Sequence, residues 1–256
     1  MCIRDSVSTD CDGCARSSVD DAPDGDQLVR SATIFGASGG LARALTRELL
    51  DQRWQVNAVC RVARAEILRQ EFEPQIRAHQ MHLHTVENEY TEFEFLCPSD
   101  VIIMTQALFE PAPLTSMALK AITDEVAVGL THPMRITRAF LQKFPPVAGV
   151  SRNICFIGST SAYAGFKNTS VYCAVKHGLL GFVRAMNDEY ASTDDRFLLF
   201  SMGTMLTDMG RKVQGQDAST YLQPRDVAQR IVSIILSSSN LFEPEVIIRR
   251  RTVKFL

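Results

Sequence analysis

The sequence has little of what several large classes of protein need. Lysine plus arginine (27) do not exceed aspartate plus glutamate (29), whereas proteins that bind nucleic acid through its phosphates carry a basic excess. No apolar run approaches the ~18 residues that a membrane-spanning helix needs, and the N-terminus lacks the apolar region of a signal peptide. Seven cysteines spread over 256 residues are not the pattern of a disulfide framework. These absences favour a cytoplasmic globular protein with no nucleic-acid or membrane partner.

The first thirty residues differ in composition from the rest of the chain. Residues 1–30 are rich in aspartate and poor in large apolar side chains. Such a segment cannot bury enough surface to offset its ordering entropy, so we expect a disordered acidic tail. The lone pair Cys11 and Cys14 has no second ligand pair nearby, so we predict no metal site. The opening Met-Cys-Ile-Arg-Asp-Ser resembles a translated sequencing adaptor, which leaves the natural start open.

From residue 31 onward, strand-like and helix-like segments alternate. Short apolar runs typical of strands occupy residues 32–35, 55–60, 82–86, 101–104, 153–157, 197–201 and 245–249. Segments with helical spacing occupy residues 41–52, 62–72, 113–144, 171–190 and 225–236. This alternation predicts an α/β fold with a doubly wound parallel sheet, covered by helices on both faces. With no internal repeat and no linker, residues 31–256 are predicted to form a single domain.

A glycine-rich turn lies between the first predicted strand and the first predicted helix. It contains Gly36, Ser38, Gly39, Gly40 and Leu41. Glycines let the backbone turn sharply and approach a pyrophosphate, whose charge is favoured at a helix N-terminus. An ordinary tight loop is the alternative, but the position at the start of a βαβ unit favours a dinucleotide site.

The end of the second predicted strand bears on which dinucleotide is bound. Selectivity for NAD usually requires an acidic residue there, but this chain has Cys60 followed by Arg61, with Arg64 close by. A 2′-phosphate would therefore meet a cation and no repelling carboxylate. We predict that NADP(H) is preferred and that NAD(H) is possible; the alternative is that Arg61 is only a solvated surface residue.

Three residues form a candidate catalytic group. Tyr172 and Lys176 are four residues apart at the start of a predicted helix, so they share a face of it. An ammonium close to a phenol lowers the phenol pKa, which suits a tyrosine that exchanges a proton with a carbonyl or alcohol oxygen. Ser159 follows a buried strand, at the sheet edge where open α/β sheets place their ligands. Ser161 is the second choice for the catalytic serine.

These segments resemble the short-chain dehydrogenase/reductase family over nearly all of residues 31–256. Residues 36–42 are similar to its TGxxxGxG turn, residues 157–161 to its serine segment, Tyr172 and Lys176 to its YxxxK pair, and residues 202–209 to its PG…TDM segment. The resemblance implies a seven-stranded Rossmann sheet and hydride transfer between a nicotinamide and a carbonyl or alcohol. It also implies a homodimer or homotetramer, built on the fourth and fifth helices.

The resemblance assigns roles to individual residues. Tyr172 would be the acid/base, Lys176 would hold the nicotinamide ribose, and Ser159 would polarise the substrate oxygen. Together with the inference for Arg61, the implied cofactor-binding set is Gly36, Ser38, Gly39, Gly40, Leu41, Arg61, Tyr172, Lys176, Gly203 and Thr207.

The chain departs from the family pattern at several positions. Residues 104–107, Met-Thr-Gln-Ala, replace the usual Asn-Asn-Ala-Gly, and Met202 replaces a proline. Gly129 aligns with a catalytic asparagine and offers no side chain for a proton relay to Lys176. His132 is close in sequence, but a capping or surface role is expected for it.

The C-terminal quarter offers a candidate substrate lid at residues 204–223. Its apolar lining is expected to include Met205, Leu206, Met209 and Tyr221, with contributions from Phe109, Tyr163 and Phe166; packing in the core explains the lid residues almost as well. Residues 249–251, three arginines, are expected to be a solvated strand end, with a contact to a neighbouring subunit or an acidic substrate group as the alternative. Cys155 and Cys173 are expected to be small core residues.

The combined prediction is an NADP(H)-dependent oxidoreductase that acts on a small carbonyl or alcohol substrate. The alternative is a dinucleotide-binding regulatory or partner protein of the same fold with little catalysis, because Gly129 and residues 104–107 depart from the family. A nucleotide-sugar epimerase is disfavoured, since only about 50 residues follow Met202.

Overall fold

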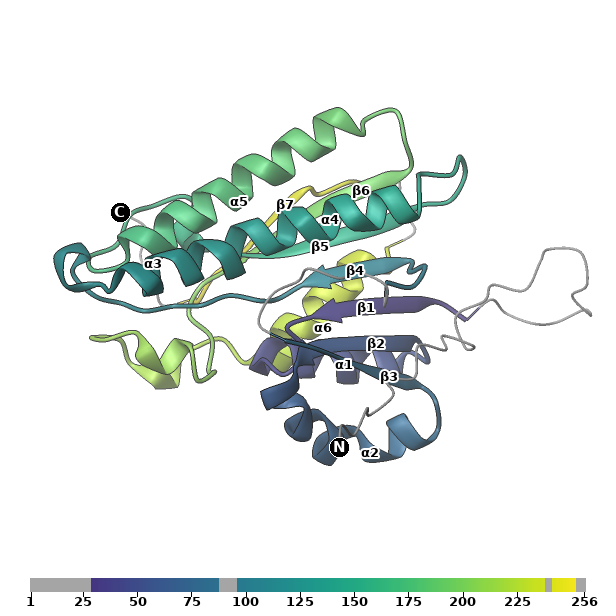
Figure 1. The fold of residues 1–256 in the computed structure, drawn as a ribbon, viewed down its shortest axis with the longest axis horizontal. Helices are drawn as coiled ribbons and strands as arrows, with labels where there is room; N and C mark the ends of the chain where they lie inside the picture. The colour runs from purple at the N-terminus through teal and green to yellow at the C-terminus, as the bar shows by residue number, and fades with distance from the viewer. Residues whose placement is uncertain (1–28, 88–95, 238–240, 252–256) are drawn as a thin grey trace, which may run out of the picture.

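A parallel sheet organises the molecule. The computed structural model describes residues 29–87, 96–237 and 241–251 (Figure 1). Within them the strands are β1 (Ser31–Phe35), β2 (Gln55–Arg61), β3 (Met81–Val86), β4 (Val101–Met104), β5 (Arg152–Ser159), β6 (Asp195–Met202) and β7 (Glu245–Ile248). They form one seven-stranded parallel sheet in the order β3-β2-β1-β4-β5-β6-β7. The predicted doubly wound Rossmann sheet is confirmed.

The order of the strands reverses between β1 and β4, which are neighbours in the sheet although two strands separate them in sequence. Phe35, at the end of β1, pairs with Val59 on one side and Met104 on the other, and Ser159 pairs with Met202. The ends of β1, β2, β4, β5 and β6 therefore share one edge of the sheet. Ligands of open α/β sheets bind at this edge, beside the reversal point.

Helices cover both faces of the sheet and build two hydrophobic cores. One face carries α1 (Gly40–Asp51), α2 (Ala65–Arg77) and α6 (Pro224–Ile235), and the other carries α3 (Leu119–Val126), α4 (His132–Lys143) and α5 (Ser170–Glu189). Figure 1 shows α4 and α5 lying together across the strands. All four residues of β4 are buried, as expected for a strand covered on both sides.

The helix predicted at residues 113–144 is wrong in its boundaries and its continuity. Residues 114–116 form only a short 3-10 turn, α3 begins at Leu119, and a π-helical turn at residues 127–131 separates α3 from α4. Pro133 lies in the first turn of α4 and has no backbone N–H, so it cannot complete the regular i to i−4 bond to Gly129. Single π-helical turns of this kind are often found at functional sites.

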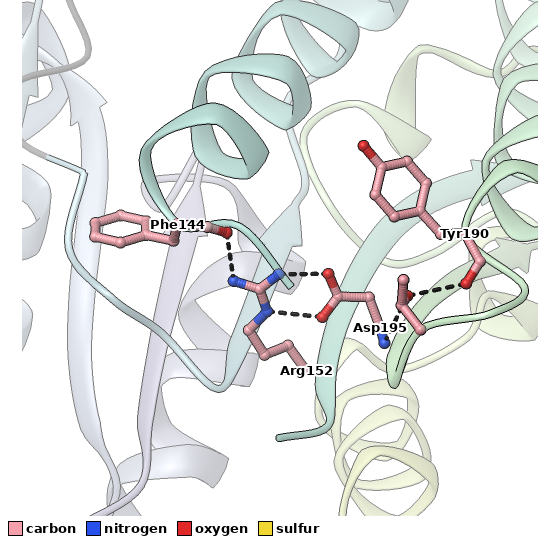
Figure 2. A network of polar contacts seen from close by, with 5 residues as sticks. Phe144, Arg152, Tyr190 and Asp195 are labelled. Carbon is pink, nitrogen blue, oxygen red and sulfur yellow. Dashed lines mark hydrogen bonds and ion pairs between the residues drawn. The ribbon is translucent and has the colours of Figure 1, made fainter. Parts of the chain in front are cut away.

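A buried ion pair lies at the amino ends of β5 and β6 (Figure 2). Arg152 Nε donates to Asp195 Oδ1 at 2.7 Å, Nη2 donates to Oδ2, and Nη1 donates to the Phe144 carbonyl oxygen at 2.7 Å. The guanidinium also lies 5.0 Å from the centre of the Phe140 ring. The arginine side chain is 7% exposed and the aspartate side chain is fully buried, so the pair ties two core strands together inside the protein.

Two expectations fall wholly or largely outside the described residues: the acidic tail and the pair Cys11 and Cys14. No described helix is both long enough and apolar enough to cross a membrane.

Candidate active site

The glycine-rich turn has a backbone that only glycine suits at its first position. Gly36 has φ +76°, and its N–H and that of Ala37 both donate to the Val59 carbonyl oxygen at 3.0 Å. A Cβ on Gly36 would lie 2.8 Å from Thr105 Oγ1 and 2.9 Å from the Gln106 nitrogen. The turn is therefore held between the ends of β2 and β4.

The start of α1 is suited to an anion. Gly39 is the N-cap and supplies no side-chain cap, and the first turn of the helix contains no acidic residue. The first backbone N–H groups of a helix carry partial positive charge and bind phosphate well. The side chain of Leu41 packs in the core at 5% exposure, so this predicted cofactor residue can contribute only its backbone.

Thr207 lies against the same turn. A Cβ on Gly40 would be 2.8 Å from Thr207 Cγ2, so the predicted lid begins in contact with the start of α1. Gly203, by contrast, donates its N–H to the Ile248 carbonyl oxygen at 2.9 Å and so anchors the chain to the end of β7. The structure thus brings Gly40 and Thr207 together, whereas Gly203 directly follows β6 and lies beside the end of β7.

The segment that replaces the usual Asn-Asn-Ala-Gly has polar atoms available for a ligand. Thr105 Oγ1 donates to the Phe35 carbonyl oxygen at 2.7 Å and ties the end of β4 to the end of β1. Gln106 Oε1 and Nε2 are both buried and have no hydrogen-bond partner among the residues that the structure describes. Buried amides are nearly always paired, so this one is suited to the polar edge of a bound dinucleotide.

The end of β2 is cationic. Arg61 and Arg64 are exposed there, beside Cys60, which is 1% exposed. Burial raises the pKa of the Cys60 thiol, and the charges of Arg69 and Arg64 act in the opposite direction. The position that would carry an acidic residue in an NAD-selective site is therefore a buried thiol beside exposed guanidinium groups.

Ser159, Tyr172 and Lys176 meet at the ends of β5 and α5. Ser159 is the last residue of β5, and its Oγ accepts from the Ser161 N–H at 3.1 Å. Burial raises the pKa of Tyr172 to about 12, and a hydrogen bond with the Ser159 side chain opposes that increase. Lys176 Nζ lies 5.5 Å from the centre of the Tyr172 ring and donates to the Ile157 carbonyl oxygen at 2.8 Å.

The expected lowering of the Tyr172 pKa by Lys176 is wrong for this structure, because burial dominates both side chains. Burial also lowers the pKa of Lys176 to about 8, so its ammonium group loses a proton only slightly above neutral pH. Tyr172 is then protonated at neutral pH, which suits a proton donor. Its ring is covered edge-on by Phe109 at 4.9 Å between ring centres.

The sequence interpretation missed Glu125. This residue of α3 is 1% exposed, and its charge affects both Tyr172 and Lys176. A sequence signal existed: Glu125 lies four residues before Gly129 and therefore shares its helix face. At Gly129 itself, a Cβ would lie 2.6 Å from Val175 Cγ1, so α5 leaves no room for a side chain where the family has asparagine.

The remaining expectations have mixed outcomes. His132 is 6% exposed, so a surface role is wrong. Tyr163 donates to Glu245 Oε2 at 3.0 Å, and Phe166 is 53% exposed. Cys155 and Cys173 are both buried, as expected of small core residues.

The lid and the arginine run also differ from expectation. Met205 packs against the core, and Tyr221 is buried with the Arg250 guanidinium 5.5 Å from its ring centre. Arg250 Nη1 also donates to Thr220 Oγ1 at 2.9 Å, so this arginine anchors the lid and is not a solvated strand end. Lys212 of the lid reaches across to the Phe109 carbonyl oxygen at 3.2 Å and to Glu110 Oε1 at 2.9 Å.

The glycine-rich turn, the cationic end of β2 and the group of Ser159, Tyr172 and Lys176 all fit the pattern of a single protein family. A family model described as short chain dehydrogenase matches residues 30–218, and the chain belongs to this family. It is an oxidoreductase of the kind that acts on alcohol or carbonyl groups with a nicotinamide dinucleotide.

Individual relatives are distant. Benzil reductase ((S)-benzoin forming) of Bacillus subtilis is 26% identical over 199 residues, which are 73% of this chain and 79% of that protein. With other curated relatives the match spans 49% or 41% of the relative's length. Among solved structures, an alcohol dehydrogenase of Thermococcus sibiricus complexed with 5-hydroxy-NADP superposes with TM-score 0.75 at 17% identity, covering 89% of this chain and 99% of that one. A 4-hydroxyisoleucine dehydrogenase complexed with NADH gives TM-score 0.76 at 16% identity, covering 86% and 97%.

Proposed function

We propose that this chain is an NADP(H)-dependent reductase or dehydrogenase of a small carbonyl or alcohol, with Tyr172 as the acid/base. The observation that carries the proposal is the hydrogen bond between Ser159 and a protonated Tyr172, with Lys176 beside them. Gly36, Ser38, Gly39, Gly40 and Leu41 form the phosphate turn that would hold the dinucleotide; Thr207 contacts this turn at Gly40, and Gly203 lies at the end of β6, beside β7.

The chemistry divides between the cofactor and the protein. A bound nicotinamide supplies or accepts the hydride. Ser159 donates a hydrogen bond to the substrate oxygen and polarises it. Tyr172, held protonated by burial, gives its phenolic proton to the oxygen as negative charge develops there. Lys176 lies beside the ring and stabilises the phenolate that remains.

The preference for NADP(H) is based on Arg61 and Arg64. Both side chains are exposed at the end of β2, where the ribose 2′ position of a dinucleotide lies in this fold. Solved neighbours of the same fold bind 5-hydroxy-NADP in one case and NADH in another, so the argument depends on the residues of this chain.

Isothermal calorimetry with NADPH and NADH tests the cofactor proposal. For Arg61→Ala we expect about tenfold weaker NADPH binding, which corresponds to ~1.4 kcal/mol, with NADH binding unchanged. Arg77→Ala, which removes an exposed arginine from α2, is the matched control and should alter neither affinity. Equal or tighter binding of NADH to the wild type would refute the preference.

The substrate class follows from the environment of Tyr172. Phe109 lies edge-on against its ring, so an aromatic side chain borders this residue. The relative named benzil reductase supports a panel of candidate substrates that begins with aromatic ketones and diketones.

We also propose that the enzyme is cytoplasmic, and that it assembles as a homodimer or homotetramer, as the family pattern implies.

Steady-state turnover on this panel tests the catalytic assignment. Tyr172→Phe is expected to lower kcat by 10²–10⁴-fold, because it removes the transferable proton. Tyr190→Phe, at the opposite end of α5, is the matched control and is expected to retain activity. Tight dinucleotide binding without turnover of any carbonyl would favour the regulatory or partner role, which the crowded position of Gly129 supports.

A further inference from the structure

A buried carboxyl group lies within electrostatic range of the catalytic pair. Glu125 is 1% exposed, and its carboxylate has no hydrogen bond of normal geometry within the described part of the chain, only a weak interaction with the Glu110 backbone. Burying a poorly paired carboxylate costs several kcal/mol, so a residue needed only for packing would be apolar here. The retained acid therefore points to a role in the chemistry of its neighbours.

Four titratable side chains from three parts of the chain lie within electrostatic range of Glu125. Tyr172 and Lys176 come from α5, Glu110 from the loop before α3, and Lys212 from the lid. Burial raises the pKa of Glu125 to about 7; the charge of Glu110 adds to this, and the Glu110 backbone, Lys176 and Lys212 oppose it. The carboxyl group thus exchanges its proton near neutral pH.

The position of Glu125 compensates for a missing group. It lies one helical turn before Gly129, where Val175 of α5 excludes any side chain. Gly178 is also in close contact with this helix, since a Cβ there would lie 3.0 Å from Leu130 Cδ2. The close approach of α5 to the π-helical turn brings Lys176 within electrostatic range of the one acid that α3 buries.

We propose that Glu125 is a positioning residue that sets the protonation of Lys176 and, through it, of Tyr172. The inference rests on the proposed function. During reduction Tyr172 gives its proton to the product oxygen and becomes phenolate. The phenolate takes a proton from the Lys176 ammonium, and the resulting amine takes one from the Glu125 carboxylic acid. The Glu125 carboxylate is then reprotonated by solvent, which completes the balance.

The first test needs neither cofactor nor substrate. In the full-length protein labelled with [13Cε]lysine, NMR titration follows Lys176, whose signal is assigned by its absence in Lys176→Met. Glu125→Gln removes the nearby negative charge, so the Lys176 midpoint is expected to fall by about one pH unit. Asp124→Asn removes the same charge from the next residue, which is exposed and paired with Lys120, and should leave the midpoint unchanged. An unmoved midpoint in Glu125→Gln, or equal shifts in both variants, would overturn the proposal.

The second test concerns turnover. For reduction by the wild type, kcat is expected to fall as pH rises through about 7, where Glu125 loses its proton. Glu125→Gln should have roughly tenfold lower kcat and unchanged KM values below pH 7, because its amide has no proton to give. An unchanged kcat in Glu125→Gln at pH 6 would contradict the inference. If the wild type reduces no carbonyl, the proposed function fails, while the NMR titration still decides the coupling.

Discussion

The two edges of the sheet contain buried polar groups that are paired to different degrees. At the amino ends, Arg152 and Asp195 form a bidentate pair, and the remaining guanidinium nitrogen is bound by a backbone carbonyl (Figure 2). Near the carboxyl edge of the sheet, Gln106 has buried amide atoms without hydrogen-bond partners among the described residues, and Glu125 has only a weak interaction with the Glu110 backbone.

This difference distinguishes buried polar groups that stabilise the fold from buried polar groups that we assign to function. A buried ion pair is tolerated only when its hydrogen bonds are complete, as they are around Arg152. Incomplete pairing is a cost that folding alone does not justify, and we assign the incompletely paired atoms of Glu125 and Gln106 to proton transfer and ligand binding under the proposed function. The comparison predicts that substitutions at the two ends differ in the sign of their effect on stability.

The largest effect is expected at the paired end. Asp195→Ala leaves the Arg152 guanidinium buried and uncompensated, so the free energy of unfolding should fall by about 3–5 kcal/mol. Urea denaturation measures it, and turnover below the melting temperature should be unchanged. Glu73→Ala, which breaks an exposed pair with Arg77, should cost less than about 1 kcal/mol. Similar losses in both variants would remove the distinction between the buried and exposed pairs.

The next effect is a pH-dependent gain at the unpaired end. The folded-state pKa of Glu125, about 7, lies above its usual value of 4.5, so the folded state binds more protons between these values and wild-type stability falls as pH rises. Glu125→Leu removes this loss. Its stability relative to wild type should therefore improve by roughly 2–3 kcal/mol between pH 5 and pH 8. Urea denaturation at both pH values measures the gap, and a constant gap would contradict a raised pKa.

A smaller loss is expected where the family asparagine is restored. Gly129→Asn places a side chain against Val175 and should destabilise the protein by about 1–3 kcal/mol through overpacking, without raising kcat. Gly181→Asn on α5 is the matched control, because a Cβ there meets nothing within 4 Å. Increased turnover in Gly129→Asn would show that the missing amide, and not Glu125, limits this site.

The smallest effect compares two buried amides. Gln106→Leu removes an amide without partners in the described structure, so stability should change by less than about 1 kcal/mol. Asn187→Leu removes an amide that bonds both the carbonyl oxygen and the N–H of Phe197, at 2.8 and 3.1 Å, and should cost more. Thermal melts rank the two variants, and a larger loss for Gln106→Leu would reveal a partner for its amide.

The sequence was sufficient to predict the sheet, because its buried strands are continuous apolar runs such as residues 101–104 and the turn glycines punctuate them. It also located Tyr172, Lys176 and Ser159, whose spacing depends on a single helix and a single strand end. The break in the long helix was missed, because the helical periodicity continues through the π-helical turn and Pro133 signals only a first-turn position.

Glu125 was missed and His132 was misjudged for a related reason. A polar residue inside a helical pattern is ordinarily solvated, and spacing alone cannot show that α5 packs closely enough to bury it. The dominance of burial over the charge of Lys176 in setting the Tyr172 pKa is likewise a property of the folded environment, which no motif encodes.

The contact between Thr207 and Gly40 connects the start of α1 to the segment that follows β6. A ligand that fixes the start of α1 restrains the first residues of this segment, and a ligand that orders the segment restrains α1 in return. Thermodynamic reciprocity then requires that dinucleotide and substrate alter each other's affinity by the same factor. The contact of the Thr207 methyl group with Gly40 thus couples the binding of dinucleotide and substrate within a single domain, which favours cooperative, ordered binding.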